Sequence, residues 1–347
     1  VDPHTHQVWA GDRAAEFEAR LQGKTYMEIM AAGGGINSTV NATRQASPED
    51  LYAQTRLRAE AMFRYGTTTT EAKTGYGLAF DAELAQLEVL LRLDAEGPLE
   101  IVPTFMPAHA VPPEFKGREE DYTRVITAEM LPLLKEWWVN HHSARPMPFV
   151  DVFCENNAFD LSQTREILTR AQELCFPLKA HVDEFENLGG AALAVELGAV
   201  SIEHAVKTSA AEITALGASD TVVVSLPCTP FGLADPHYTP ARNLLAAGGT
   251  LAIATDLNPG TAWCENMQFV IALACRYLKI TPAQAVAAAT INAAHAIQRD
   301  HLIGSLEPGK QADLLILTVP DYRHLAYRFG GNLVQSVIKK GRVFKFI

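Results

Sequence analysis

Eight short runs rich in apolar and β-branched residues recur along the chain, and each ends in a polar or glycine-bearing loop. A stretch of helical character follows each run. Strand-like runs that alternate with helices are typical of parallel βαβ units. The runs span residues 1–6, 66–77, 100–113, 149–159, 177–185, 199–206, 220–231 and 249–260.

Helix-start signals stand between these runs. Ser47 precedes Pro48 and two acidic residues, a sequence favoured at an N-cap, a first helical position and a first turn. Asp160 opens a later segment of the same kind, and Thr281 precedes another proline. These signals predict helices that begin near all three polar residues.

The number of runs favours a closed barrel over an open sheet. Eight parallel strands with intervening helices close into a (β/α)8 barrel, whereas a doubly wound sheet does not need that number. No repeat or low-complexity segment interrupts the alternation. We therefore predict an α/β fold, a TIM-like barrel that occupies residues 1–304.

The pattern changes after residue 304. A turn-like EPGK sequence (307–310) introduces two stretches that resemble short strands, ADLLILTVP (312–320) and VQSVIKKGRVFKF (334–346). We predict that residues 305–347 form part of a small β subdomain.

Composition narrows the class of protein. The net charge of -11 argues against nucleic acid or an anionic membrane as the partner, since binders of either carry clustered basic surface. No apolar run approaches the ~20 residues of a membrane span. The five cysteines are scattered and include no C-x-x-C pair, which favours a reduced, cytoplasmic protein. We expect the partner to be a small molecule. It could be an anion in spite of the negative net charge, because one arginine in the site would bind it.

Ionisable residues end several of the otherwise apolar runs. His4 and His6 lie two positions apart, so both imidazoles point to the same side of a strand. The carboxyl ends of barrel strands hold the active site, and imidazole with carboxylate suits Zn²⁺ or Fe²⁺. Any one of these residues alone is more simply a buried, hydrogen-bonded group, and it is the set that predicts a metal site. The strand-end residues are His4, His6, His181, His204 and Asp256, with Glu184 three residues after His181, and the expected metal ligands among them are His4, His6, His181 and Asp256.

These residues resemble the motifs of the amidohydrolase superfamily. Within it, the chain is similar to the imidazolonepropionase family over essentially its whole length. The metal motifs are common to the superfamily, whereas Arg13, Tyr76, His109 and the DLNPGT segment make the resemblance specific. The matching segments are PHTHQVWAGDRAAEFEARLQG, AGGGINSTVNATR, KTGYG, PAHAVPPEF, AHVDEFENLGGAALA and ATDLNPGT.

The resemblance implies a role for each matching residue. The implied metal ligands are His4, His6, His181 and Asp256. The implied catalytic residues are Glu184, His204 and Asp256. The residues implied to hold substrate or product are Arg13, Tyr76, His109, Glu184, Asn258, Gly260 and Thr261.

The implied reaction is hydrolysis of the cyclic amide of 4-imidazolone-5-propanoate to N-formimino-L-glutamate, a step of histidine degradation. A bound metal ion lowers the pKa of its water from ~15.7 toward ~7, and the hydroxide would attack the ring carbonyl. Glu184 would carry the proton to the departing ring nitrogen, while His204 would donate to the carbonyl oxygen. Arg13 would bind the propionate carboxylate as a bidentate fork. A salt bridge within its own acidic helix is the alternative for Arg13.

We expect one divalent ion per chain, Zn²⁺ or Fe²⁺. Binuclear amidohydrolases use a carboxylated lysine at the end of the fourth strand, where this chain has Cys154 and Glu155 and no lysine. The family also implies a homodimer.

Two other functions stay open at this point. An aminohydrolase of the cytosine- or guanine-deaminase type would use the same metal set, but its nucleobase substrates lack the carboxylate that Arg13 suits. A non-catalytic barrel that serves as a binding protein would have no use for an acid/base such as Glu184.

A final expectation concerns the first residues. Amidohydrolases of this type begin with strands that pair with the C-terminal strands, and none precede Val1. We therefore expect that the subdomain lacks its N-terminal strands, which leaves exposed edges after residue 312 and lowers stability or solubility.

Overall fold

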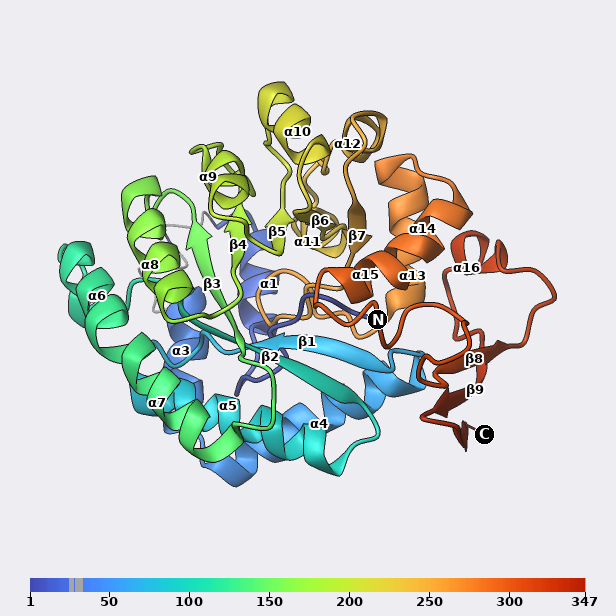
Figure 1. Cartoon of the computed structure of the whole chain (residues 1–347), viewed down its shortest axis with the longest axis horizontal. Helices are drawn as coiled ribbons and strands as arrows, with labels where there is room; N and C mark the ends of the chain where they lie inside the picture. The colour runs from blue at the N-terminus through green and yellow to red at the C-terminus, as the bar shows by residue number, and fades with distance from the viewer. Residues whose placement is uncertain (25–27, 29–33, 347) are drawn as a thin grey trace.

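A curled, seven-stranded parallel sheet lies at the centre of the computed structural model, with helices around it (Figure 1). The structure describes residues 1–24, 28 and 34–346, so the start of the AGGGINSTVNATR segment lies outside the described residues. The strands lie side by side in chain order, as successive βα units require. They are β1 (Thr69–Lys73), β2 (Glu100–Ala108), β3 (Phe149–Cys154), β4 (Lys179–Val182), β5 (Ser201–His204), β6 (Val222–Ser225) and β7 (Leu251–Ile253).

The segment before α1 fills the gap between the two edges of this sheet. Asp2 bridges Thr70 of β1, and Thr5 bridges Leu257 just after β7, both in parallel orientation. The prediction of a regular strand over residues 1–6 is wrong, because Pro3 has no N–H to give to a ladder and only isolated bridges form. The segment nevertheless takes the place of the first barrel strand, as predicted. The TIM-like α/β fold is confirmed.

The predicted helix starts are present. The Ser47 side chain accepts a hydrogen bond from the Asp50 backbone N–H, and Asp160 and Thr281 each form a capping box. The segment after Thr281 divides into two short helices instead of one. The helices are α1 (Ala14–Leu21), α3 (Ile36–Gln45), α4 (Pro48–Arg64), α5 (Phe80–Glu96), α6 (Glu119–Val125), α7 (Leu131–His142), α8 (Leu161–Glu173), α9 (Gly190–Glu196), α10 (Ala210–Gly217), α11 (Cys228–Leu233), α12 (Ala241–Ala246), α13 (Met267–Leu273), α14 (Pro282–Ala288), α15 (Ile291–His295) and α16 (His324–Tyr327).

A three-stranded antiparallel sheet lies beside the barrel, at the red end of the chain in Figure 1. Its strands are β8 (Leu314–Leu317), β9 (Val334–Lys339) and β10 (Arg342–Lys345), with β9 in the middle. Leu315 and Ile316 of β8 are exposed. The domain boundary at residue 304 and the absence of partner strands stay predictions. No helix in the described part of the chain is long and apolar enough to cross a bilayer.

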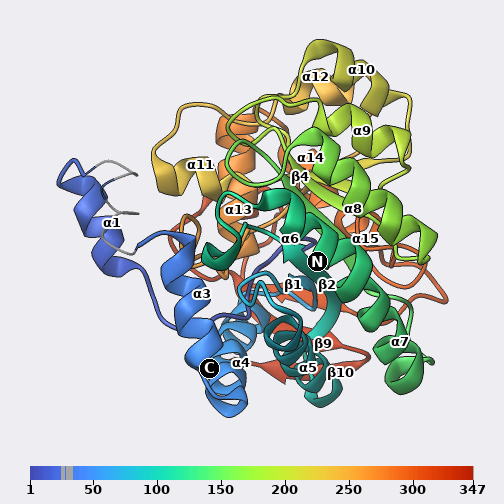
Figure 2. The same cartoon turned by 90° about the vertical axis from the view of Figure 1, so that its left-hand side faces the viewer.

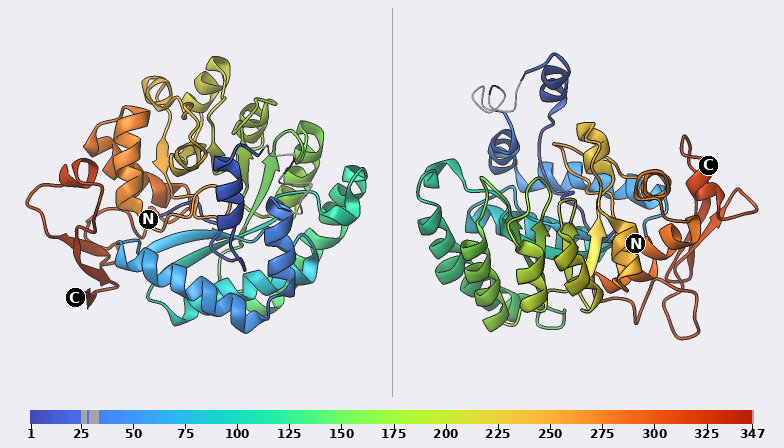
Figure 3. Two further views of the ribbon diagram at one scale, coloured as in Figure 1. Left: turned by 180° about the vertical axis from the view of Figure 1, so that it is seen from behind. Right: turned by 90° about the horizontal axis from the view of Figure 1, so that it is seen from above.

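Alternate residues of the barrel strands serve different purposes. In β4, Ala180 and Val182 belong to the apolar core, whereas Lys179 and His181 are fully buried polar residues on the other face. The barrel therefore has an apolar outer layer under its helices and a polar interior. Helix α1 stands off one face of this barrel, as Figures 2 and 3 show.

Candidate active site

Three imidazoles and one carboxylate converge inside the barrel. His4 Nε2 lies 3.2 Å from His6 Nε2, which lies 3.3 Å from His181 Nε2. Asp256 Oδ1 lies 3.3 Å from His4 Nε2 and 3.7 Å from His6 Nε2. All four side chains are buried. The structure thus brings together the four residues expected to bind metal, which come from the bridged segment, from β4 and from the segment just after β7.

The chemistry of this set fits a divalent cation. Burial lowers the pKa of both His4 and His6 well below the usual value, with neighbouring cationic groups adding to the effect. Neutral imidazoles are the form that binds metal, and lone pairs pointed at one another need a cation between them. Burial also raises the pKa of Asp256 to about 6. Ligand atoms of His4, His6 and Asp256 all lie within 4.8 Å of one another, as do those of His4, His181 and His204.

The chain turns sharply where these strands end. Asp183, His204 and Asp256 have φ values of 57°, 70° and 54°, in the left-handed region that residues with a Cβ seldom adopt. Such conformations cost about 1–3 kcal/mol each and concentrate at functional sites. The turns thus lie at His204 and Asp256 themselves and directly before Glu184, whereas the Asp183 side chain accepts a hydrogen bond from the Thr208 hydroxyl.

Glu184 lies beside His204, with Oε2 3.5 Å from His204 Nε2. Burial raises the pKa of Glu184 well above the usual value, and the charges of Asp256 and Glu155 add to the rise. Glu155, which sequence reasoning noted only for not being a lysine, accepts hydrogen bonds from the backbone N–H groups of Phe185 and Glu186 at 2.9 and 3.2 Å. It therefore fixes the turn that carries Glu184.

Two rings stand against the histidine cluster. His109 stacks on His6, with ring centroids 4.6 Å apart and planes inclined by 17°, while the Tyr76 ring lies 6.0 Å from His6. His109 Nδ1–H donates to the Gly75 carbonyl at 3.0 Å, and burial lowers the pKa of His109 to about 3. Gly75 has a φ of 114°, and a Cβ there would lie 2.9 Å from His109 Nδ1. Glycine is thus required for this packing.

The segment after Asp256 forms a tight turn around one amide. Asn258 Oδ1 accepts from the backbone N–H groups of Gly260 and Thr261, both at 2.8 Å. Asn258 Nδ2 donates to the Asp256 carbonyl at 2.7 Å. The turn therefore ties the expected substrate residues to the strand end that carries Asp256.

Arg13 packs against this turn. A Cβ at Gly260 would overlap Arg13 Nη1, which shows how closely the guanidinium approaches the glycine. Arg13 Nε and Nη2 are bound to Glu16 Oε2 at 2.9 and 2.8 Å, so the salt bridge considered from the sequence is present. Nη1 is left on the side of Gly260. Sequence reasoning missed Arg20, which donates to the Gly260 carbonyl at 3.1 Å.

A group of charged residues beneath the histidines was also missed. They lie within the predicted strands, where their charge inside otherwise apolar runs was the available signal. All of them are fully buried. They are Glu71, Lys73, Asp151, Lys179 and Glu203.

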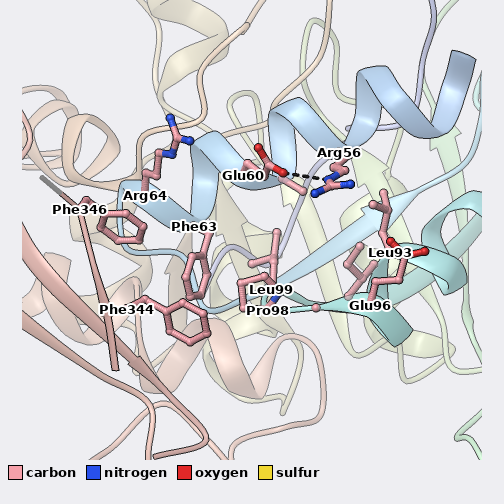
Figure 4. Close-up of a pocket in the computed structure, with 13 residues that line it drawn as sticks. Arg56, Glu60, Phe63, Arg64, Leu93, Glu96, Pro98, Leu99, Phe344 and Phe346 are labelled. Atoms are coloured by element: carbon pink, nitrogen blue, oxygen red, sulfur yellow. Dashed lines mark hydrogen bonds and ion pairs between the residues drawn. The ribbon is translucent and has the colours of Figure 1, made fainter. Parts of the chain in front are cut away.

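A cavity lies away from the histidine cluster, next to the amino end of β2 (Figure 4). This cavity of about 410 Å³ is lined by Phe63 of α4, by the residues just before β2 and by Phe344 and Phe346 near the C-terminus. Arg56 and Glu60, which also line it, pair with each other at 2.8 Å. Amino ends of barrel strands serve stability more than catalysis. The candidate active site is therefore the histidine cluster at the carboxyl ends of the strands and not this cavity.

The amidohydrolase family model matches residues 1–344, and the chain belongs to this family. An imidazolonepropionase of Herpetosiphon aurantiacus is 53% identical over 345 residues, which is 99% of this chain and 81% of that protein. Several further imidazolonepropionases match at 42–52% identity, so within the family the chain groups with the imidazolonepropionases. The predicted family and enzyme class are confirmed.

Solved structures share the fold at much lower identity. A 5-methylcytosine deaminase from Klebsiella pneumoniae liganded with phosphonocytosine matches with a TM-score of 0.75 and 18% identity, over 100% of this chain and 86% of that one. A zinc-bound adenosine deaminase from Xanthomonas campestris matches with a TM-score of 0.64 and 20% identity, over 87% of this chain and 71% of that one. These likenesses show a common barrel.

Proposed function

We propose that this chain hydrolyses 4-imidazolone-5-propanoate to N-formimino-L-glutamate. One observation carries the proposal: His4, His6, His181 and Asp256 converge at the barrel mouth beside the Glu184–His204 pair. The 53% identity to an imidazolonepropionase over 99% of the chain supports this substrate. The deaminase alternative has the support of the fold alone.

The four converging residues would hold one divalent ion. When bound, such an ion lowers the pKa of a coordinated water toward neutrality and so supplies a nucleophile. The zinc in the adenosine deaminase of the same fold supports Zn²⁺, and imidazole with carboxylate also accepts Fe²⁺. Strand β3 ends at Cys154 with no lysine, which supports a single ion. Elemental analysis that finds two tightly bound ions per chain would contradict this.

Side chains of the protein would transfer the proton, stabilise the developing charge and orient the nucleophile. Glu184, with its raised pKa, accepts the proton of the nucleophilic water and delivers it to the departing ring nitrogen. The neutral His204 ring donates a hydrogen bond to the carbonyl oxygen as negative charge develops there. Asp256 orients the nucleophile.

The substrate's propionate would lie toward the turn at Gly260. Arg13 presents Nη1 there, while Glu16 holds its other nitrogens and so fixes the plane of the guanidinium. Tyr76 and His109 supply the ring-lined wall next to His6. Asn258 shapes the turn through Gly260 and Thr261.

The test is an assay of the purified protein with 4-imidazolone-5-propanoate. We expect loss of the imidazolone absorbance and formation of N-formimino-L-glutamate, both abolished by a chelator and restored by Zn²⁺ or Fe²⁺. Release of ammonia from a panel of nucleobases, without imidazolone hydrolysis, would favour a deaminase instead. We further propose that the chain works in the cytoplasm as a homodimer. Light scattering after size-exclusion chromatography tests the oligomeric state.

A further inference from the structure

Two of the converging histidines are each bonded to a carboxylate through the ring nitrogen that faces away from the cluster. His4 Nδ1 lies 2.6 Å from Glu203 Oε2, and His181 Nδ1 lies 3.1 Å from Asp151 Oδ1. Glu203 and Asp151 are fully buried and belong to β5 and β3. An ionised carboxylate can only accept, so each Nδ1 must carry the hydrogen and each Nε2 keeps its lone pair.

A lysine holds the second oxygen of each carboxylate. Lys179 Nζ lies 3.0 Å from Glu203 Oε1, and the Ser201 hydroxyl donates to the same oxygen at 2.6 Å. Lys73 Nζ lies 2.7 Å from Asp151 Oδ2. Both lysines are fully buried. The barrel therefore contains two parallel chains of contacts, each running from lysine to carboxylate to histidine.

The third histidine of the cluster is held differently. His6 Nδ1 is buried and has no hydrogen-bond partner among the described residues. Its ring is fixed instead by stacking on His109. Of these three histidines, His4 and His181 thus have a carboxylate that selects one tautomer.

Burial of so many charges is not explained by stability. Buried ion pairs often contribute nothing net, because desolvation offsets their attraction, whereas removal of one partner leaves a costly unpaired charge. In metal sites, by contrast, a carboxylate on the far nitrogen of a histidine orients the ring and raises its basicity. The arrangement therefore points to a role in the site above it.

We propose that Asp151 and Glu203, held by Lys73 and Lys179, are positioning residues that fix His181 and His4 as Nδ1–H tautomers with Nε2 directed at the metal. This inference rests on the proposed function, because it takes the histidine cluster as the metal site.

The chain provides a matched control in Glu71. Its Oε1 lies 2.7 Å from Lys73 Nζ, the same distance as Asp151 Oδ2, and both carboxylates are fully buried. Among the described residues, Glu71 makes no hydrogen bond or ion pair with a histidine. The Thr104 hydroxyl also donates to its Oε1, and the Thr5 backbone N–H lies 3.3 Å from its Oε2. Asp151→Asn and Glu71→Gln therefore each alter a buried carboxyl group that binds the same lysine, and of the two residues Asp151 alone also binds a histidine ring.

The experiment measures zinc affinity of the full chain by competition with a chelating indicator. We expect Asp151→Asn and Glu203→Gln to bind zinc about 10- to 100-fold more weakly than the parent, and Glu71→Gln to bind like the parent. Parent-like affinity in both Asp151→Asn and Glu203→Gln would overturn the inference, and so would an equal loss in Glu71→Gln. A parent protein that binds neither Zn²⁺ nor Fe²⁺ would instead refute the proposed function.

A second measurement needs no variant of the carboxylates, which covers the case in which those variants fail to fold. Histidine ¹⁵N chemical shifts of the unaltered protein report which ring nitrogen is protonated. Single His4→Gln and His181→Gln variants assign the two signals. We expect Nδ1–H tautomers for both rings, and an Nε2–H tautomer in either would overturn the inference.

Discussion

At the scale of single residues, Asp256 is held so that one carboxylate oxygen faces the histidines. The Thr229 hydroxyl donates to Oδ2, while Oδ1 lies 3.3 Å from His4 Nε2. Thr229 comes from α11, which follows a different strand from the one that precedes Asp256. The orientation of this ligand therefore depends on a residue outside the ligand set.

Replacement of Thr229 by valine tests that dependence. We expect zinc to bind about tenfold more weakly, because Oδ2 loses its partner and the carboxylate can rotate. Competition with a chelating indicator measures the change. Thr221→Val is the control. The Thr221 hydroxyl is also buried, but it lies just before β6, away from the histidines, and donates to the Ala199 carbonyl. Equal affinities in the parent and Thr229→Val would show that the contact has no such role.

Glu184 is the residue on which the proposed proton transfer depends. We expect Glu184→Gln to lower kcat by about 10²- to 10⁴-fold, because the amide can neither accept nor deliver the proton. Metal content should stay unchanged, since Glu184 is not among the four converging residues. Steady-state kinetics with elemental analysis measures both. A variant with full activity would remove Glu184 from the mechanism.

The raised pKa of Glu184 sets the expected pH dependence. Glu184 must be ionised to accept a proton, so activity should fall as the pH drops through its pKa, which burial, Asp256 and Glu155 raise. Glu155→Gln removes one of the like charges, and the acid limb of kcat/KM should therefore move to lower pH. A pH profile of both proteins measures the shift, and a limb that moves upward would contradict this assignment.

At the scale of elements, the alternating pattern located every regular strand of the barrel. Each predicted run from residue 66 onward contains one of β1 to β7, because the polar and glycine-bearing loops end the strands where the sequence indicates. The run at residues 1–6 is the exception. Its bridges to Thr70 and Leu257 depend on the closed barrel, and Pro3 prevents a continuous ladder.

The candidate site could be predicted where its residues stand at strand ends. The spacing of His4 and His6 and the polar ends at His181, His204 and Asp256 were visible in the sequence. The contacts beneath them were not, because a charge within a strand does not reveal which of several neighbouring strands carries its partner. Glu203 and His4, for example, are 199 positions apart and meet only across the interior.

The approach of helix α1 to the turn after β7 gives a prediction at this scale. Gly260→Ala places a methyl group against Arg13 Nη1, so we expect KM to rise about tenfold with kcat little changed, as for a loss of uniform binding. Kinetics with 4-imidazolone-5-propanoate measures it. Gly330→Ala is the control, because a Cβ there meets no atom within 4 Å. An unchanged KM would show that the glycine is not needed for Arg13.

At the scale of the whole molecule, a bound ion links segments that lie far apart along the chain and should stabilise the barrel. Binding to the folded state alone contributes about 2.7 kcal/mol when the free ion is at 100 times its Kd. We therefore expect Tm to rise by several degrees as zinc is added and to return on chelation, measured by thermal unfolding. His4→Ala should show no such rise. If the Tm of the parent protein does not change with zinc, the folded state does not bind zinc more tightly than the unfolded chain, and the proposed site is wrong.

The bridged segment at residues 2–6 also has a consequence for the order of folding. The Asp2 carboxylate accepts a hydrogen bond from the Thr255 hydroxyl, 253 positions away, and contacts of that separation form late. His4 and His6 therefore meet Asp256 only after the intervening strands have curled into a barrel. A partly wrapped chain would contain the histidine of β4 without the other ligands. We therefore expect the ion to enter a closed barrel and not to nucleate folding.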